Sequence, residues 1–252
     1  MTKTQVLSSQ LNSTTYDETY EAICQFLSTS DQPGYITVNN VHTVVEGVVD
    51  SDYGEIINGS FMALPDGKPL SVVARWKGDS HMERVFGPTL FEKVLDWSQH
   101  SELNHYFFGS TPTTIEKLKN IIQTKYPDTR LAGFFSPPFR SFSPEENESY
   151  IQDMNGKHAN IIWIGLGAPK QEKWMAENIH RLNNGLMIGI GAGFDYLTGD
   201  TKHAPSWMKN YSLEWVYRLI QEPKRLWKRY CVTIPIFIGY NLLELIGLKK
   251  FN

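Results

Sequence analysis

Three glycine-containing loops have the composition expected where a chain binds a small anionic ligand. Each follows an apolar segment, and the second leads at once into Lys170, Gln171 and Glu172. Glycine lets the backbone approach a ligand closely, and the N-terminus of a following helix offers free N–H groups that favour anions. A nucleotide diphosphate suits such loops, although α/β proteins also use glycine in ordinary turns. The loops are residues 109–112, 165–169 and 189–193, with Gly109, Gly167 and Gly191 as the candidate binding positions.

A carboxylate and two neutral polar side chains end two other apolar segments. Asp66 follows an apolar segment, in the stretch Leu64-Pro65-Asp66-Gly67. There it could accept a proton from a hydroxyl group or simply form a turn. Asn39 ends the segment 35–39, and Thr37 lies two residues earlier, so both project from the same face of a strand. These three residues are candidates for chemistry on a polar substrate.

The elements that must position these residues alternate between strands and helices. Strand-loop-helix succession predicts an α/β fold, a Rossmann-like and mostly parallel sheet with helices on both faces. In such sheets, ligands bind beyond the carboxyl ends of the strands, where the candidate loops lie. The expected strands are residues 35–40, 60–67, 105–111, 129–135, 160–167 and 185–196, and the clearest helices are 41–49, 112–126 and 169–182.

The chain of 252 residues divides into an acidic body and a basic tail. Residues 206–252 hold eight lysines and arginines against three acids, whereas residues 1–205 hold sixteen against twenty-four. We therefore expect a core domain, residues 1–205, and a C-terminal appendage, residues 206–252, that meets an anionic partner. Two cysteines and an N-terminus without a signal-peptide pattern are typical of a cytoplasmic protein.

The appendage joins its basic segment to an apolar one. Residues 230–248 approach the length needed to span a membrane, but Asn241, Glu244 and Pro235 interrupt them. A helix lying on the membrane surface, with its cations at the lipid headgroups, fits this pattern better. The alternative is a helix that packs on the core. One short basic stretch on an acidic body gives little support for nucleic-acid binding.

Metal and dinucleotide cofactors are not expected. Asp50-Ser51-Asp52 matches the D-x-D pattern of metal-dependent sugar-nucleotide enzymes, yet it sits where a helix end or turn is favoured. No histidine or cysteine cluster has zinc spacing, and no clean G-x-G-x-x-G motif opens a βαβ unit. A nucleotide-binding oxidoreductase, which would need that motif, is therefore disfavoured.

Seven motifs in this order resemble the WecG/TagA/CpsF glycosyltransferases over roughly residues 5–230. The most specific are "IIWIGLGAPKQEKWM" and "LEWVYRLIQEPKRLWKRY", with "TVNNVHTV", "LPDGKPL", "ERVFGPTLFEKVLDW", "FFGSTPTTIEKLK" and "GIGAGFDYLTGDTKHAPSWM". The resemblance implies a bacterial, inverting, metal-independent enzyme at the inner face of the cytoplasmic membrane. Such enzymes transfer a sugar from a UDP-sugar to a polyprenyl-diphosphate-linked sugar in surface polysaccharide or teichoic acid synthesis. It also implies a Rossmann-like core with a C-terminal appendage that closes over the site.

The same resemblance assigns roles to residues of this chain. Asp66 falls on the family's proposed general base, and Thr37 and Asn39 fall on a polar pair near the reacting sugars. Gln171 matches a glutamine expected to contact the donor. The remaining matches are cations for the diphosphates: Arg84, Arg218, Arg225 and, for a third basic position of the appendage, Lys228 or its neighbour Arg229.

The donated sugar is left open by the sequence. N-acetylmannosamine, in β-1,4 linkage, is the family's most frequent donor sugar, with UDP-glucose or another UDP-hexose as the alternative. A different class of function is a membrane-associated protein that binds nucleotide-sugars without catalysis, although Asp66, Asn39 and Gln171 together favour an enzyme. Self-association is a further expectation, since an exposed apolar tail favours assembly.

Overall fold

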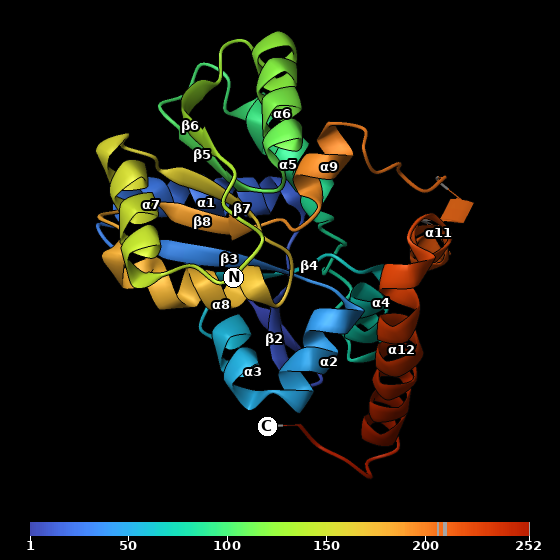
Figure 1. Ribbon diagram of the computed structural model, residues 1–252. Helices are drawn as coiled ribbons and strands as arrows, with labels where there is room; N and C mark the ends of the chain where they lie inside the picture. Colours follow the sequence, from blue (N-terminus) through green and yellow to red (C-terminus); the bar gives the residue numbers. More distant parts are fainter. Residues whose placement is uncertain (206, 209–210, 252) are drawn as a thin grey trace.

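The computed structural model describes residues 1–205, 207–208 and 211–251, and its centre is a six-stranded parallel sheet (Figure 1). The strand order is β4-β3-β8-β7-β5-β6, and every neighbouring pair is parallel. This confirms the predicted α/β class. The strands are β3 (Gly34–Asn39), β4 (Met62–Pro65), β5 (Asn104–Gly109), β6 (Arg130–Phe135), β7 (Ile161–Gly165) and β8 (Leu186–Gly189).

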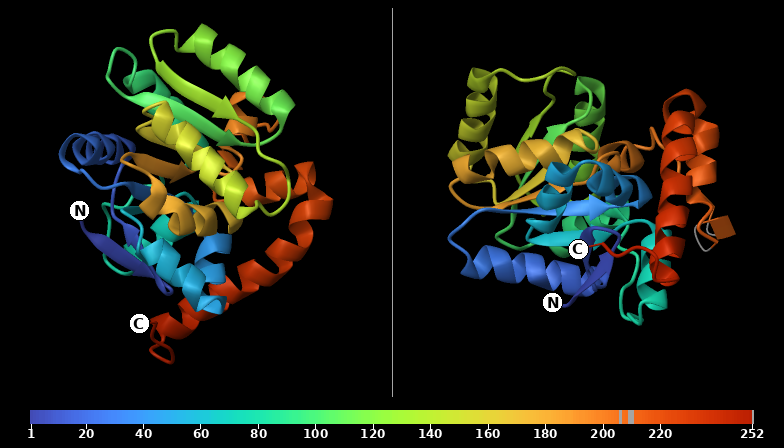
Figure 2. Two further views of the ribbon diagram at one scale, coloured as in Figure 1. Left: turned by 60° about the vertical axis from the view of Figure 1, so that its left-hand side comes forward. Right: turned by 90° about the horizontal axis from the view of Figure 1, so that it is seen from below.

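Helices cover both faces of the sheet, as the two views in Figure 2 show. Strand residues alternate between the faces, so in β3 Ile36 and Val38 enter one apolar core while Tyr35 enters another. Helices α1 (Tyr16–Thr29), α5 (Gly87–Trp97), α6 (Pro112–Lys125) and α9 (Gly193–Leu197) line the first face. On the second face lie α7 (Pro144–Gly156) and α8 (Lys170–Asn178), with the short helix η1 (Ile179–Arg181) after α8.

A third apolar cluster joins the sheet edge at β4 to the C-terminal part of the chain. It combines α2 (Val41–Val49), α3 (Ser51–Asn58) and α4 (Lys68–Trp76) with Phe237 from the last helix. Helix α3 also packs on α8, which extends the layer over the second face. This cluster supports the carboxyl ends of β3 and β4, where Asn39 and Asp66 lie.

An N-terminal hairpin and α1 precede the first predicted strand, and sequence patterns had not indicated them. Strands β1 (Lys3–Val6) and β2 (Ser9–Asn12) pair antiparallel, and the Asn12 amide oxygen accepts a hydrogen bond from the backbone N–H of Ala63 at 2.8 Å. The start of α1 is a capping box, in which the Thr15 hydroxyl and the Glu18 carboxylate bond each other's backbone N–H. Thr15 and Glu18, three residues apart, are therefore the feature of the sequence that indicates the start of α1.

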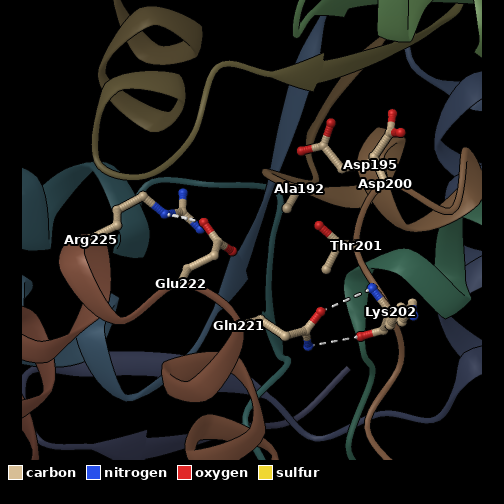
Figure 3. Close-up of a pocket in the computed structure, with 8 residues that line it drawn as sticks. All are labelled: Ala192, Asp195, Asp200, Thr201, Lys202, Gln221, Glu222 and Arg225. Carbon is tan, nitrogen blue, oxygen red and sulfur yellow. Dashed lines mark hydrogen bonds and ion pairs between the residues drawn. The ribbon is translucent and has the colours of Figure 1, made fainter.

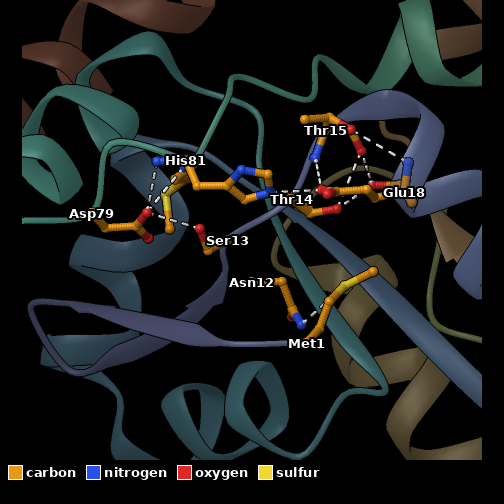
Figure 4. Close-up of polar contacts among 10 residues, drawn as sticks. Met1, Asn12, Ser13, Thr14, Thr15, Glu18, Asp79 and His81 are labelled. Carbon is orange, nitrogen blue, oxygen red and sulfur yellow. Dashed lines mark hydrogen bonds and ion pairs between the residues drawn. The ribbon is translucent and has the colours of Figure 1, made fainter.

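The hairpin region fixes the loop that follows α4. The Asp79 carboxylate accepts hydrogen bonds from the hydroxyl groups of Thr4 and Ser13 at 2.5 and 2.9 Å. Figure 4 shows the contact with Ser13 and the contact between His81 and Glu18, in which His81 Nε2 lies 2.9 Å from Glu18 Oε2. The Glu83 N–H donates to the backbone oxygen of Thr14 at 3.1 Å. Contacts with the N-terminal segment therefore fix the loop at residues 79, 81 and 83, directly before Arg84.

The C-terminal appendage consists of α11 (Glu214–Gln221) and α12 (Pro223–Leu245), which stand beside α2 and α4 (Figure 1). Helix α12 packs on α2, and its side chains Leu226 and Phe237 are buried. Many of its other apolar side chains face outward. Those at least half exposed are Trp227, Val232, Ile238, Leu242 and Leu245, and Ile246 and Leu248 just after the helix are exposed as well.

Membrane insertion of this appendage was disfavoured from the sequence. Within the described part of the chain, no helix combines the length and the hydropathy that crossing a membrane requires. The division at residue 205 stays a prediction, and Ser206 and Lys209, which belong to the predicted appendage, lie outside the described residues.

Candidate active site

Asp66 lies at the carboxyl end of β4, directly before α4. Its backbone N–H donates to the Asn39 oxygen at 2.7 Å, which ties it to the end of the neighbouring strand β3. Its side-chain Oδ1 accepts a 2.7 Å hydrogen bond from the N–H of Gly87, at the start of α5. These two hydrogen bonds, to β3 and from α5, hold the carboxylate in a fixed place between β4 and α4.

The surroundings of Asp66 raise the pKa of its carboxyl group well above the ordinary value for aspartate. Burial raises its pKa to about 6, and the nearby Glu214 carboxylate adds to this effect. The Arg84 guanidinium, the Gly87 N–H and Arg218 oppose it. A carboxylate with this pKa is a suitable general base at neutral pH, because it is ionised yet accepts a proton readily.

Arg84 connects Asp66 to the appendage. Its Nε donates to the backbone oxygen of Asp66 at 2.6 Å, and its Nη2 donates to the Glu214 carboxylate at the start of α11. Both side chains of this ion pair are largely buried, and the guanidinium also lies 4.4 Å from the ring centroid of Phe86. Arg84 therefore holds α11 over the end of β4.

Thr37 and Asn39 lie on the neighbouring strand β3 and are fully buried. The Asn39 Nδ2 donates to the Thr37 Oγ1 at 2.9 Å, whereas the Asn39 Oδ1 has no hydrogen-bond partner among the described residues. Neither residue lines the cavity beside Asp66. Their predicted contact with the reacting sugars stays a prediction, and the unpaired Oδ1 is the atom available for it.

A cavity of about 510 Å³ opens beside Asp66, between α4 and the appendage. Its polar end contains Asp66 with Arg84, Arg218 and Arg229. Its apolar wall comes from both sides, including Val72, Val73 and Trp76 of α4 and Leu226, Ile238 and Leu242 of α12. One cavity thus offers cations, a carboxylate and a long apolar surface.

The structure separates the predicted cations of α12. Arg229 lines the cavity beside Asp66, whereas Lys228 is exposed, with its Nζ 5.7 Å from the ring centroid of Trp227. Of the two alternatives for the third basic position, Arg229 is therefore the one that reaches the cavity. Arg225 lies elsewhere: its Nε donates to the Glu222 carboxylate at 2.6 Å, and both residues line a second cavity.

The second cavity, of about 530 Å³, lies between α9 with its flanking loops and the corner of α11 and α12 (Figure 3). Figure 3 shows Asp195 and Asp200 on one side, with Glu222 and Arg225 on the other. The Gln221 side chain exchanges two 3.3 Å hydrogen bonds with the Lys202 backbone, which fastens α11 to the core. Carboxylates and an arginine of this kind suit a ligand with both hydroxyl groups and phosphates.

The three glycine loops meet at adjacent strand ends, where the backbone requires glycine. Gly109, Gly167 and Gly191 have φ angles of +138°, +81° and +55°. A Cβ atom at Gly109 would lie 2.5 Å from the backbone oxygen of Gly165. The loops after β5 and β7 can therefore pack this closely only without a side chain at position 109.

Gln171, predicted to contact the donor, is buried behind these loops. Its Oε1 accepts hydrogen bonds from the N–H groups of Gly167 and Gly191, at 3.1 and 3.0 Å, and it lines neither cavity. Direct contact with a ligand stays a prediction. What the structure shows is a side chain that joins two of the glycine loops.

Asp50 and Asp52 of the D-x-D motif lie at the start of helix α3, Asp50 as its N-cap and Asp52 in its first turn. The Asp50 carboxylate caps α3 by accepting from the Tyr53 N–H at 3.1 Å and pairs with Lys173 Nζ at 2.7 Å. This agrees with the helix-end interpretation of the D-x-D motif. Among the residues that the structure describes, no group of three His, Cys, Asp or Glu side chains could hold a metal ion.

Sequence patterns missed two residues of the Asp66 cavity. Glu214 lies in the same motif as the predicted arginines Arg218 and Arg225, but its ion pair with Arg84 depends on a contact across 130 positions. His42 lines the cavity with both ring nitrogens buried and without a partner among the described residues. Burial, reinforced by the charge of Arg229, lowers the pKa of His42 to about 4, so the imidazole is neutral.

These features define an α/β protein with a cavity at the carboxyl edge of a parallel sheet, in which a carboxylate lies beside several arginines. The chain belongs to the WecG/TagA/CpsF family of glycosyl transferases, whose family model matches residues 4–250. The chain is therefore a glycosyltransferase by family, as its motifs predicted.

Relatives of known name are similar over most of their length. An N-acetylglucosaminyldiphosphoundecaprenol N-acetyl-beta-D-mannosaminyltransferase of Bacillus subtilis (strain 168) is 28% identical over 223 residues, which are 86% of this chain and 82% of the relative. Proteins of the same name from Bacillus spizizenii and Staphylococcus aureus (strain MW2) are 24% and 23% identical. The alignment with the Bacillus spizizenii protein covers 81% of this chain and 77% of the relative. The alignment with the Staphylococcus aureus protein covers 94% of this chain and 91% of the relative.

Proposed function

We propose that this chain transfers N-acetylmannosamine from its UDP derivative to a polyprenyl-diphosphate-linked N-acetylglucosamine, with inversion and without a metal ion. The names of the similar proteins support the sugar and the acceptor. The observation that carries the proposal is the Asp66 carboxylate, with its pKa near 6, in a cavity that also presents three arginines and an apolar wall.

The cavity beside Asp66 is the proposed acceptor site. A polyprenyl-diphosphate sugar combines an apolar chain with two phosphates and a hydroxylated ring. The wall formed by α4 and α12 suits the first isoprene units, and Arg218 and Arg229 suit the diphosphate. The acceptor sugar then lies at the polar end, within reach of Asp66.

The glycine loops and the second cavity are the proposed donor site. The loops end adjacent strands β5, β7 and β8, where nucleotides bind in α/β sheets. In the second cavity, Asp195 and Asp200 suit sugar hydroxyl groups and Arg225 suits a phosphate. The Glu222 carboxylate that pairs with Arg225 exchanges for that phosphate when the donor binds.

The reaction follows from these positions. Asp66 accepts the proton of the acceptor hydroxyl as its oxygen attacks the anomeric carbon, and the bond from that carbon to UDP breaks on the opposite side, which inverts the configuration. Negative charge develops on the departing diphosphate. Fixed cations and backbone N–H groups stabilise such charge, so Arg84, Arg225 and the N–H groups of the glycine loops supply what a metal ion would otherwise supply.

In this proposal the appendage is a peripheral element at the inner face of the cytoplasmic membrane, where the lipid-linked acceptor would lie. The cations of α12 and its exposed apolar side chains would meet anionic headgroups and the outer part of the acyl chains. Self-association through the same apolar surface remains a proposal, and its test is the oligomeric state with and without detergent.

A transfer assay with a panel of UDP-sugars tests the function. The acceptor is a synthetic polyprenyl-diphosphate N-acetylglucosamine, and each reaction contains EDTA. Transfer from UDP-N-acetylmannosamine alone is the expected result. Preference for UDP-glucose or another UDP-hexose would correct the sugar, dependence on an added metal would overturn the metal-independent mechanism, and UDP binding without any transfer would indicate a non-catalytic protein.

A further inference from the structure

The side-chain amide of Gln171 is oriented by two sets of partners that demand the same arrangement. The N–H groups of Gly167 and Gly191 can only donate, so they require the amide oxygen, which accepts from them at 3.1 and 3.0 Å. On its other side, the amide Nε2 donates to Glu172 Oε1 at 2.7 Å. An ionised carboxylate can only accept, so it requires the amide nitrogen.

Glu172 is itself an unusual residue, because its carboxyl group is fully buried. Burial raises its pKa to about 6, and the hydrogen bond from Gln171 opposes that shift most. Neither its second oxygen, Oε2, nor the buried Tyr53 hydroxyl has a hydrogen-bond partner among the described residues. The two groups are close enough to interact: burial and the Glu172 carboxylate raise the pKa of Tyr53, and Tyr53 in turn lowers the pKa of Glu172. Burying a carboxyl group with so few hydrogen-bond partners lowers the stability of the fold, so the presence of Glu172 at this position calls for an explanation.

Space for this arrangement comes from Gly189, the last residue of β8. A Cβ atom at Gly189 would lie 3.0 Å from Gln171 Nε2 and 2.9 Å from the Met175 side chain. The φ angle of Gly189 is not in the left-handed region, so the need for glycine here is one of space. The sheet thus leaves room for the amide between the two loops.

We propose that Glu172 is a positioning residue, which holds the Gln171 amide so that its oxygen joins the glycine loops after β7 and β8. Without the carboxylate, the amide could rotate by half a turn and place its NH2 group against two backbone donors, and the loops would separate. Glu172 lines neither cavity, so it acts on the ligand only through Gln171. The consequence for donor binding rests on the function proposed above.

Two substitutions at Glu172 separate this role from simple packing. Glu172→Leu fills a similar volume but cannot accept the hydrogen bond, whereas Glu172→Gln keeps an acceptor for Gln171 Nε2. Hydrogen exchange of the Gly167 and Gly191 amides in the full chain reports the loop contacts directly. We expect exchange about 10-fold faster or more in Glu172→Leu, and within about threefold of wild type in Glu172→Gln.

An exchange of the two side chains gives the sharpest test. Gln171→Glu alone places two carboxylates against each other and should weaken the loop contacts. The double variant Gln171→Glu/Glu172→Gln restores every donor and acceptor, with the carboxylate now facing the loop N–H groups. We expect the double variant to recover protection of Gly167 and Gly191 to within about threefold of wild type, a coupling that independent residues would not show.

Calorimetric titration with UDP reports the functional consequence in the same proteins. Glu172→Leu should bind UDP about 10-fold more weakly, with the Michaelis constant of the acceptor within twofold of wild type. Unchanged amide protection in Glu172→Leu, or a double variant no better protected than Gln171→Glu, would overturn the positioning role. If wild type does not bind UDP, the donor assignment fails, and the amide protection still decides the role of Glu172.

Discussion

At the scale of single residues, the chemistry depends on a balance of charges around Asp66. Burial and Glu214 disfavour the ionised carboxylate, whereas Arg84 and the N–H of Gly87 favour it. The resulting pKa, about 6, lies well above the ordinary value for aspartate. Asp66 is therefore ionised at neutral pH, and the proton that it accepts during transfer is released readily afterwards.

This balance predicts the pH dependence of catalysis. Only the carboxylate form can accept the proton, so kcat/KM should rise about tenfold per pH unit below 6 and level off above it. Initial rates between pH 4.5 and 8.5 measure the profile, and circular dichroism at each pH controls for unfolding. A flat profile from pH 5 to 8 with a folded protein would contradict the role of Asp66.

Neighbouring cations of α12 give a matched pair of variants. Arg229 lines the acceptor cavity, whereas Lys228 is exposed beside Trp227. Loss of a charged hydrogen-bond donor to the diphosphate should raise the acceptor KM about 10-fold or more in Arg229→Ala. Lys228→Ala should stay within twofold, and equal effects of the two substitutions would show that α12 contributes only general positive charge.

Residue types and strand ends were enough to predict the position of Asp66, but the sequence left Lys228 and Arg229 as alternatives. Successive residues on a helix point about 100° apart, so only the packing of α12 decides which one faces inward. Glu214 and His42 were missed for a related reason. Glu214 pairs with Arg84 across 130 positions, and the cavity that His42 lines is completed by residues of α12, so no local pattern contains that information.

At the scale of elements, the glycine loops set how closely the strand ends approach one another. The positions of these loops could be predicted from the sequence, because each has glycine directly after an apolar segment. The sequence could not predict which glycine is indispensable, since this depends on backbone angles and on neighbouring loops. Gly109 faces the backbone of Gly165, whereas a Cβ atom at Gly167 would meet no atom within 4 Å.

Alanine at these two positions should therefore have different costs. Gly167→Ala requires only an unfavourable backbone angle, at about 1 kcal/mol. Gly109→Ala adds a clash with the Gly165 backbone to its angular strain, so its cost should reach about 3 kcal/mol or more. Urea unfolding measures both values. Equal losses would mean that the loops adjust freely and do not define a fixed site.

The N-terminal hairpin shows where element prediction fails. Its strands, Lys3–Val6 and Ser9–Asn12, are four residues each and carry mostly polar side chains, so they lack the apolar alternation that marks a strand. Their stability comes from pairing and from contacts such as Asn12 with the Ala63 N–H. Helix α1 was predictable from its capping box.

At the scale of the whole molecule, the predicted α/β class is confirmed, but the strand order was beyond the sequence. The order β4-β3-β8-β7-β5-β6 depends on which apolar faces fit together. It also brings Asp66 from β4 and the loop after β8 to one edge. The charge division between body and tail was visible from the start, whereas the two cavities beside α11 and α12 required the structure.

Membrane association should depend on the apolar surface of the appendage. Trp227 and Leu245 are 50% and 65% exposed on α12, and Phe139, outside the appendage, is 79% exposed. Trp227→Ser combined with Leu245→Ser should lower the fraction that sediments with phosphatidylglycerol vesicles by about fivefold, and Phe139→Ser should leave it unchanged. A similar loss in the Phe139 variant, or none in the appendage variant, would argue against a membrane contact through α12.

The most direct test of the whole account is a single-turnover transfer measurement with wild type and Asp66→Asn. Both proteins receive UDP-N-acetylmannosamine and polyprenyl-diphosphate N-acetylglucosamine at pH 7.5, and UDP affinity is measured alongside. We predict a rate at least about 100-fold lower in Asp66→Asn, with UDP affinity within about threefold of wild type, because the amide cannot accept the proton. A rate close to wild type would return Asp66 to the role of a turn residue and contradict the proposed mechanism.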